Sequence, residues 1–296
     1  MNAVPETLLI VWATPLYVLV IGAEILLSHW QHRNLYSWRG VFQNLYLTLL
    51  NGSLDLLLRG LYVGLLVWVY QRRLGQLTNP WAYWTALLLL EDFVFYWLHR
   101  FDHFCRVLWA VHVTHHSSEE FNLTTGFRSS VFQPVYRFLY FIPLALLGFR
   151  PEDILVMYSA TQIWGILVHT QYVGKLGFLE WFLVTPSHHR VHHASNLQYL
   201  DRNMGMFLIV WDRLFGTFAE EDPAEPVRYG LTTNITDHSP VNLVFHEWKK
   251  LADDLRKPGP LTQKLKYLFA PPGWSHDGSS LTAAQMRQQQ ALVDSQ

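Results

Sequence analysis

Residues 81–116 read WAYWTALLLLEDFVFYWLHRFDHFCRVLWAVHVTHH, an apolar run that continues directly into two histidine motifs. As a helix, the part over 81–98 approaches the length needed to cross a hydrocarbon core of about 30 Å, because each residue adds about 1.5 Å. It contains Glu91 and Asp92, and acidic side chains in a membrane helix face protein or water rather than lipid. The stretch therefore predicts a membrane span that ends at a polar functional site.

Four further apolar segments lie on either side of this stretch. Residues 7–27 and 41–70 precede it, and residues 128–148 and 151–171 follow it as an expected helical hairpin. Because no Lys or Arg precedes 7–27, we interpret that segment as a retained span rather than as a signal peptide. The pattern predicts an all-α integral membrane protein with about four to five transmembrane helices.

The order of the spans predicts on which side the histidines lie. If the N-terminus is outside, every histidine motif reaches the same side of the membrane, and so do most basic residues near the spans. These basic residues are Arg33, Arg39, Arg100, Arg106, Arg128, Lys175 and Arg190. Arg72, Arg73 and Arg150 fall on the opposite side. By the positive-inside rule we expect a cytoplasmic helical cap that holds the histidine site, in a bacterial inner membrane or the endoplasmic reticulum.

The composition excludes several other classes of protein. Of the 296 residues 50% are hydrophobic, which excludes a disordered chain, and the formal net charge is −1. A nucleic-acid-binding protein needs an excess of Lys and Arg, which this chain lacks, so we expect no nucleic acid as a partner. Cys105 is the single cysteine, so the chain can form neither an internal disulfide nor a cluster of thiolates.

The histidines are concentrated in one part of the chain. Of 15 histidines, ten fall within residues 99–193, and they include a third motif over 188–193, HHRVHH, and a lone His169. Residues four apart share one face of a helix, so His99 and His103 can bind the same metal ion. Adjacent histidines point about 100° apart and can serve two ions. The spacing therefore predicts a metal site, and imidazole suits iron, zinc, copper and nickel alike.

These motifs and their surroundings resemble the fatty acid hydroxylase / sterol desaturase superfamily of membrane di-iron oxygenases. The resemblance covers roughly residues 85–250, and it extends to the alkylglycerol monooxygenase branch and to bacterial sterol desaturase-like proteins. Its residues are Tyr96–Arg100 with His103, Leu108–Ala110 before His112, His115–Glu120, Asn122–Thr125, Thr185–His193, Asn203–Gly205, Trp211–Phe218 and Tyr229–Thr232. Val173 stands where fatty acid 2-hydroxylases have a further histidine, which argues against simple 2-hydroxylation.

The resemblance implies a dimetal site of two iron ions (Fe2+/Fe3+) bound by nine histidines. They are His99, His103, His112, His115, His116, His169, His189, His192 and His193. Whether His188, the extra histidine of the third motif, is also a ligand stays open. Glu119 and Glu120 follow His116 directly, and we expect them to act in catalysis by orienting imidazoles or delivering protons.

The same resemblance implies that the chain hydroxylates a C–H bond of a lipid with dioxygen and electrons from outside the chain. The alkylglycerol branch implies an alkylglycerol ether as substrate and tetrahydrobiopterin as donor, so the partners are a lipid substrate, the bilayer, and a reduced pterin or an electron-donor protein. One alternative is a sterol or fatty-acyl desaturase or hydroxylase with reductase-supplied electrons. An alternative of another class is a membrane metal-binding or transport protein.

Three regions are expected along the chain. Residues 1–80 carry the N-terminal transmembrane helices, and residues 81–250 form the fatty acid hydroxylase-type catalytic region with the histidine motifs. Residues 251–296 form a C-terminal amphipathic segment that ends in a mobile, Gln- and Ser-rich tail. We expect the metal site to lie in residues 81–250, and the first contacts with lipid to be made by residues 1–80.

Overall fold

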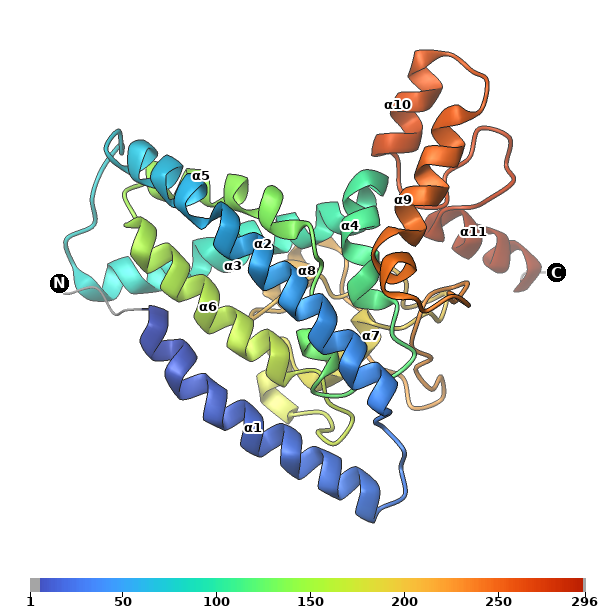
Figure 1. Ribbon diagram of the computed structural model, residues 1–296, viewed down its shortest axis with the longest axis horizontal. Coiled ribbons are helices and arrows are strands. Elements are labelled where there is room, and N and C mark those ends of the chain that lie inside the picture. Colours follow the sequence, from blue (N-terminus) through green and yellow to red (C-terminus); the bar gives the residue numbers. More distant parts are fainter. Residues whose placement is uncertain (1–5, 295–296) are drawn as a thin grey trace.

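The computed structural model describes residues 6–294, and these residues form a helical protein (Figure 1). Within that range there is no β-strand, only two isolated bridges, between Leu183 and Leu208 and between Ala194 and Tyr229. The prediction of an all-α chain is therefore confirmed. Residues 1–5 and 295–296, the outer ends of the first and third expected regions, lie outside the described residues.

The first two helices are long and apolar enough to cross a membrane. They are α1 (Glu6–Trp30) and α2 (Trp38–Tyr70), and they agree with the segments predicted over 7–27 and 41–70. Only 11% and 17% of their most apolar windows are buried, so neither is the core helix of a water-soluble protein. Their exposed side chains include Leu19, Leu26 and Leu57, and such surfaces need apolar surroundings.

Two further helices form the framework of the site. Helix α3 (Pro80–Phe104) begins at Asn79, whose side chain accepts a hydrogen bond from the Ala82 amide. Glu91 and Asp92 are fully buried in protein, as expected. Helix α6 (Pro151–Leu167) packs against α3 and begins at residue 151, as predicted, where a proline suits the first turn of a helix. Among the described helices only α1 and α2 pass the test of length and hydropathy, so the expected number of spans stays a prediction.

The continuous helix predicted over 128–148 is wrong. This segment folds into two 3₁₀ turns, η2 (Gln133–Val135) and η3 (Arg137–Phe141), followed by the short helix α5 (Ile142–Leu146). Pro134 and Pro143 explain the difference, because a proline has no backbone N–H to donate and clashes with the preceding turn of a helix. Helices α2, α3, α5 and α6 instead share a hydrophobic core.

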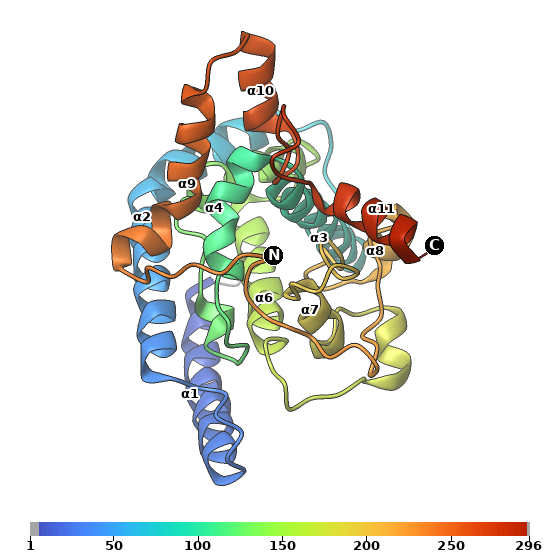
Figure 2. The same cartoon turned by 90° about the vertical axis from the view of Figure 1, so that its right-hand side faces the viewer.

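Shorter helices build the rest of the molecule. They are α4 (Arg106–His116), η1 (Thr125–Phe127), η4 (Gly177–Trp181), α7 (Pro186–His192), α8 (Val210–Phe215), α9 (Pro240–Arg256), α10 (Leu261–Phe269) and α11 (Ala283–Asp294). Figure 2 shows α4 between α9 and α3. The tail expected to be mobile contains α11, and its Arg287 donates to the carbonyl of Leu200. Helix α11 therefore returns to the region that holds the histidines.

Candidate metal centre

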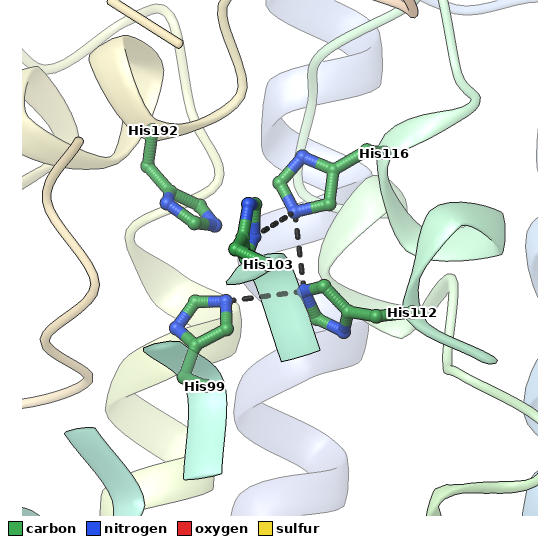
Figure 3. A group of neighbouring side chains, drawn as sticks. All are labelled: His99, His103, His112, His116 and His192. Atoms are coloured by element: carbon green, nitrogen blue, oxygen red, sulfur yellow. Dashed lines mark hydrogen bonds between the residues drawn. The ribbon is translucent and has the colours of Figure 1, made fainter. Parts of the chain in front are cut away.

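Five histidines form one group at the meeting point of α3, α4 and α7 (Figure 3). They are His99 and His103 of α3, His112 and His116 of α4, and His192 of α7. One ring nitrogen of each lies within 4.8 Å of those of all the others, and all five residues are buried. Two of the three elements supply residues four apart, so the local helix geometry aims each pair at one point.

A second group of four lies beside the first. It consists of His115, His169, His189 and His193, whose ligand atoms also lie within 4.8 Å of one another. Adjacent histidines are divided between the groups: His115 belongs to the second group and His116 to the first, and the pair 192–193 is split likewise. The rings of His116 and His193 are 4.4 Å apart between centroids. The structure therefore brings all nine predicted histidines together, in two neighbouring groups.

Backbone carbonyls set the tautomer of four of these rings. A carbonyl oxygen only accepts hydrogen bonds, so the Nδ1 atom that contacts it carries the proton and Nε2 is left with a lone pair. The Nδ1–O distances are 2.7–3.0 Å, from His99 to Met204, His115 to Arg128, His169 to Gly165 and His192 to Arg202. Each group thus receives at least two neutral imidazoles with a free electron pair directed inward.

These lone pairs fit bound cations. His169 Nε2 is 2.9 Å from His189 Nε2 and 3.2 Å from His193 Nε2, although its single electron pair can accept only one well-aligned hydrogen bond. His192 Nε2 is buried and has no hydrogen-bond partner among the described residues. Buried acceptors left without partners cost free energy. A divalent ion in each group removes that cost, and neutral nitrogen donors are the ligands that iron and zinc accept.

Residues 84–217 match the family model described as fatty acid hydroxylase, and this range contains all nine histidines. The resemblance inferred from the histidine motifs is thereby confirmed. No solved structure matches the chain.

Several curated proteins are similar to the chain over longer ranges. An alkylglycerol monooxygenase of Xenopus tropicalis is 37% identical over 223 residues, which cover 74% of this chain and 49% of the relative. The human alkylglycerol monooxygenase is 39% identical over 197 residues, covering 66% and 43%. The ornithine lipid hydroxylase OlsE of Rhizobium tropici is 30% identical over 158 residues, covering 53% and 48%. The chain spans about half the length of these relatives.

The carboxylate of Asp212, which lies outside the histidine motifs, holds the backbone segment next to His99. Asp212 accepts hydrogen bonds from the amides of Met204 and Gly205, at 2.6 and 2.8 Å, and from the Thr217 hydroxyl at 2.6 Å. Burial raises the pKa of Asp212 to about 6, so at pH 7 the ionised carboxylate can accept all three. The Met204 carbonyl in turn holds His99. The histidine spacing gave no signal for this residue.

The two predicted catalytic glutamates lie beside the site rather than in it. Glu120 accepts a 3.1 Å hydrogen bond from the Ser37 amide at the start of α2, and Glu119 is exposed. Among the described residues neither carboxylate bonds to a histidine, so their catalytic role stays a prediction. The nearer acid is Asp102, which accepts a 2.6 Å hydrogen bond from Tyr136 and lies 3.8 Å from Nδ1 of His112.

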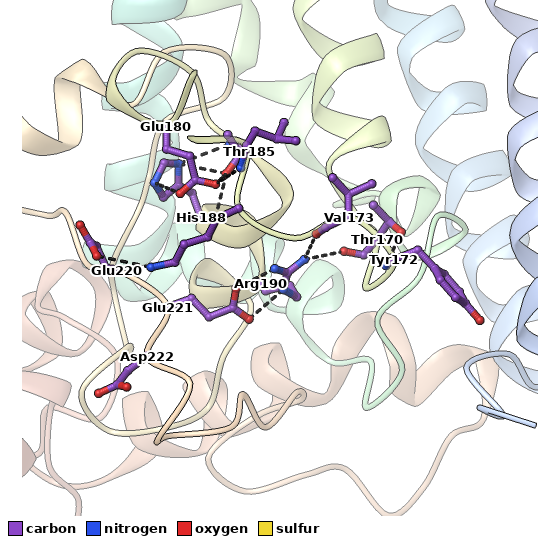
Figure 4. A network of polar contacts seen from close by, with 12 residues as sticks. Thr170, Tyr172, Val173, Glu180, Thr185, His188, Arg190, Glu220, Glu221 and Asp222 are labelled. Atoms are coloured by element: carbon purple, nitrogen blue, oxygen red, sulfur yellow. Dashed lines mark hydrogen bonds and ion pairs between the residues drawn. The ribbon is translucent and has the colours of Figure 1, made fainter. Parts of the chain in front are cut away.

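His188 lies in neither group, although it is buried on the same helix (Figure 4). Its Nδ1 is 3.2 Å from the carbonyl of Leu183, and its Nε2 is 3.6 Å from a carboxylate oxygen of Glu180. Thr185 caps the N-terminus of α7 by accepting from the His188 amide. These contacts direct the His188 ring toward Leu183 and Glu180 and away from the predicted ligands.

Arg190 ties the segment after His169 to the third motif (Figure 4). Its guanidinium donates two hydrogen bonds to Glu221, at 2.8 and 2.6 Å, in the bidentate geometry that suits a carboxylate. It also donates to the carbonyls of Thr170 and Val173, at 3.0 and 2.7 Å. The network therefore fixes the position of His169 relative to α7. The pattern of histidine motifs did not identify this network.

Cavities reach the histidines from two directions. The larger, about 550 Å³, extends from α9 and α11 to His103, His116, His192 and His193. The smaller, about 110 Å³, lies among α2, α3 and α6 and reaches five others: His99, His112, His115, His169 and His189. Only the larger falls within the range of about 300–1,000 Å³ that small-molecule sites occupy.

Acidification is expected to destabilise the metal-free protein. Burial lowers the pKa of His115 from 6.5 to about 4, and it lowers those of His112, His116, His189, His192 and His193 well below 6.5. Below pH 6.5 the unfolded chain then binds more protons than the folded one, and each such histidine costs about 1.4 kcal/mol per pH unit. Burial raises the pKa of Asp102 to about 7, so Asp102 and Asp212 act in the opposite sense, but they are fewer than the six histidines.

We therefore expect the free energy of unfolding to be level above about pH 6.5 and to fall as the pH is lowered toward 4. Thermal unfolding of the metal-free chain in detergent, repeated across this range, measures the effect. The metal-bound chain is the control, because bound ions keep the imidazoles from taking up protons. Stability that stays level or rises between pH 6.5 and 4 in the metal-free chain contradicts the explanation.

Proposed function

We propose that the chain is a membrane-bound oxidoreductase, a di-iron monooxygenase that hydroxylates a C–H bond of a lipid with dioxygen. The observation that carries the proposal is the pair of histidine groups, five and four residues, beside a cavity of about 550 Å³. The similarity to alkylglycerol monooxygenases and to an ornithine lipid hydroxylase supports a lipid as the substrate.

The protein's part in this chemistry is to hold neutral imidazoles in fixed orientations. Four Nδ1 atoms are anchored to backbone carbonyls, and Asp212 fixes one of these carbonyls, so the rings are oriented before any ion binds. Iron held by the nine histidines supplies the activation of dioxygen with two electrons from an outside donor. All nine donors are uncharged imidazoles, so the side chains that would hold iron would not neutralise its charge.

The larger cavity fits the reacting part of a lipid. Near the histidines its wall includes Trp109 and Val113 of α4, and Leu231, Leu281 and Met286 complete an apolar side. Apolar walls exclude water from a bound chain and so protect the reacting carbon from side reactions. Charged residues of α9 also line the cavity, which suits a substrate with one polar end.

The exposed apolar surfaces of α1 and α2 support an integral membrane location. A lipid bilayer is then both the solvent for these helices and the reservoir of the substrate. We propose that the histidine groups lie on the cytoplasmic side of a bacterial inner membrane or of the endoplasmic reticulum. The basic residues near the histidine motifs, such as Arg100, Arg106 and Arg190, support this orientation.

For the substrate we propose an alkylglycerol, hydroxylated at the carbon next to the ether oxygen. One oxygen atom enters the C–H bond, and the other leaves as water after uptake of two electrons and two protons. The resulting hemiacetal separates into a fatty aldehyde and glycerol. The donor is a reduced pterin such as tetrahydrobiopterin or an electron-donor protein.

We expect the purified chain, loaded with iron, to convert an alkylglycerol into fatty aldehyde when dioxygen and tetrahydrobiopterin are both supplied. Mass spectrometry of the lipid extract measures the product, and incorporation of labelled dioxygen identifies an oxygenase. Reactions without dioxygen are the control. If a sterol or an acyl lipid is converted with reductase-supplied electrons while the alkylglycerol is not, the alternative sterol or fatty-acyl reaction is correct and the ether substrate is wrong.

A metal carrier is the alternative of another class. A carrier must release its ion, whereas here eight of the nine histidines are buried and four of the rings are tied to the backbone through Nδ1. Rigid, preorganised donors favour retention of the metal. Iron that exchanges freely with a chelator, without any lipid turnover, is the result that would favour transport.

A further inference from the structure

Helix α10 carries an apolar stripe that no part of the described chain covers. Leu261, Leu265 and Phe269 stand four residues apart, and their exposed fractions are 71%, 44% and 60%. Residues with this spacing lie on one face of a helix. Tyr267, on the other side, is buried, and its hydroxyl bonds to His276. The helix is therefore attached to the protein by one face and presents large hydrophobic side chains on the other.

The charge around this stripe is positive. Helix α10 contains Lys264 and Lys266 and no acidic residue. Over residues 240–270 there are six Lys or Arg and three Asp or Glu, whereas the whole chain has a net charge of −1. Among the described residues no ion pair joins Lys264 or Lys266 to a carboxylate. An exposed apolar face flanked by lysines is typical of helices that lie in the headgroup layer of an anionic membrane.

The neighbouring helix connects this surface with the histidines. Helix α9 packs against both α10 and α4, and its Glu247, Lys250 and Asp254 line the larger cavity. Arg106 at the start of α4 pairs with Asp254 at 2.7 Å. Helix α10 is thus attached to an element that forms part of the cavity wall.

We propose that α10 docks onto the anionic headgroup layer of the membrane that holds α1 and α2. The stripe of Leu261, Leu265 and Phe269 inserts among the lipids, while Lys264 and Lys266 contact phosphate groups. This contact places the larger cavity next to the bilayer surface, where a lipid can enter without crossing water. The docking is inferred from the apolar stripe and the lysines of α10. Only the role in substrate entry rests on the proposed function.

A fluorescence experiment on the full chain tests the docking. In a Cys105→Ser background, Leu265→Cys is labelled with an environment-sensitive dye, and the protein is reconstituted in phosphatidylcholine with or without phosphatidylglycerol. Lipids that carry a nitroxide near the headgroup serve as quenchers. Glu225→Cys, at an exposed loop position, is the control label. We expect quenching at least about threefold stronger at position 265 than at 225, and weaker when phosphatidylglycerol is omitted or Lys264→Glu and Lys266→Glu are added.

Equal quenching at the two positions overturns the proposal. The proposal is also overturned if the dye at position 265 is shielded only after a soluble acidic electron-donor protein is added. That result assigns the stripe to a protein partner. For substrate entry, Leu265→Asp is expected to raise KM for a long-chain substrate severalfold, with kcat and iron content unchanged. If no variant and no wild-type chain turns over lipid, the proposed function fails, while the quenching result still decides the docking.

Discussion

Replacement of His192 by alanine is expected to remove one of two metal ions per chain and to abolish turnover. His192 belongs to the group of five, and within residues 6–294 its Nε2 has no hydrogen-bond partner. The group of four, which includes His169 and His189, keeps all its members in this variant. We expect turnover to fall by more than the roughly 10–100-fold that loss of an outer hydrogen-bond partner causes. Elemental analysis and the lipid assay measure the two effects.

His188→Ala is the matched control for this experiment. His188 and His192 are one helical turn apart on α7, and both are buried. His188, however, lies in neither group, so we expect its variant to retain both ions and most of its activity. If the two variants lose metal equally, His188 is a ligand and the division into five and four is wrong. If His192→Ala retains two ions and full turnover, the assignment of His192 is wrong.

Asp212→Ala is expected to lower both the stability of the fold and the affinity for metal. The substitution leaves two buried amides and the Thr217 hydroxyl without their acceptor, which we expect to lower the free energy of unfolding by about 3–5 kcal/mol. The peptide of Met204 then loses its anchor, and with it the carbonyl that orients His99. Loss of such an indirect support lowers metal affinity by about 10–100-fold.

Asp222→Ala provides the comparison for this prediction. Asp222 is exposed, and among the described residues its side chain accepts a hydrogen bond only from the amide of Ala224, two residues away. We expect its loss to change the free energy of unfolding by about 0.5 kcal/mol or less. Thermal unfolding in detergent and iron titration of each metal-free variant measure the two quantities. Unchanged melting and iron affinity in Asp212→Ala contradict the role that we assign to this carboxylate.

The grouping of the histidines could be predicted because it depends on local geometry. His99 and His103, or His112 and His116, need only a helix to share a face. The division of adjacent histidines between two groups follows from the same helical rotation of about 100° per residue. Convergence of α3, α4 and α7 is a tertiary property, and for that step the resemblance to a family carried the inference.

The groups that orient the rings could not be predicted from residue types. The carbonyls of Met204, Arg128, Gly165 and Arg202 fix four tautomers, and every residue of the chain has a carbonyl. Proximity in sequence was also a poor guide, since Glu120, four residues after His116, bonds to the Ser37 amide.

Hydropathy predicted the helices that are exposed to an apolar environment. It failed where prolines or tertiary contacts determine the structure. It located α1 and α2 closely, because composition alone defines an apolar helix of that length. It failed over 128–148, where two prolines divide an equally apolar segment. It also gave no signal for α11, whose place depends on the contact between Arg287 and the carbonyl of Leu200.

The iron content of the unsubstituted chain tests the central claim most directly. The metal-free protein, titrated with ferrous iron under anaerobic conditions and freed of loosely bound ions on a desalting column, is analysed for iron per chain. Because the nine rings form two groups, we predict two tightly held ions. A chain that retains one ion or none, although it is folded and its histidines are unmodified, contradicts the dimetal site and the oxygen chemistry that depends on it.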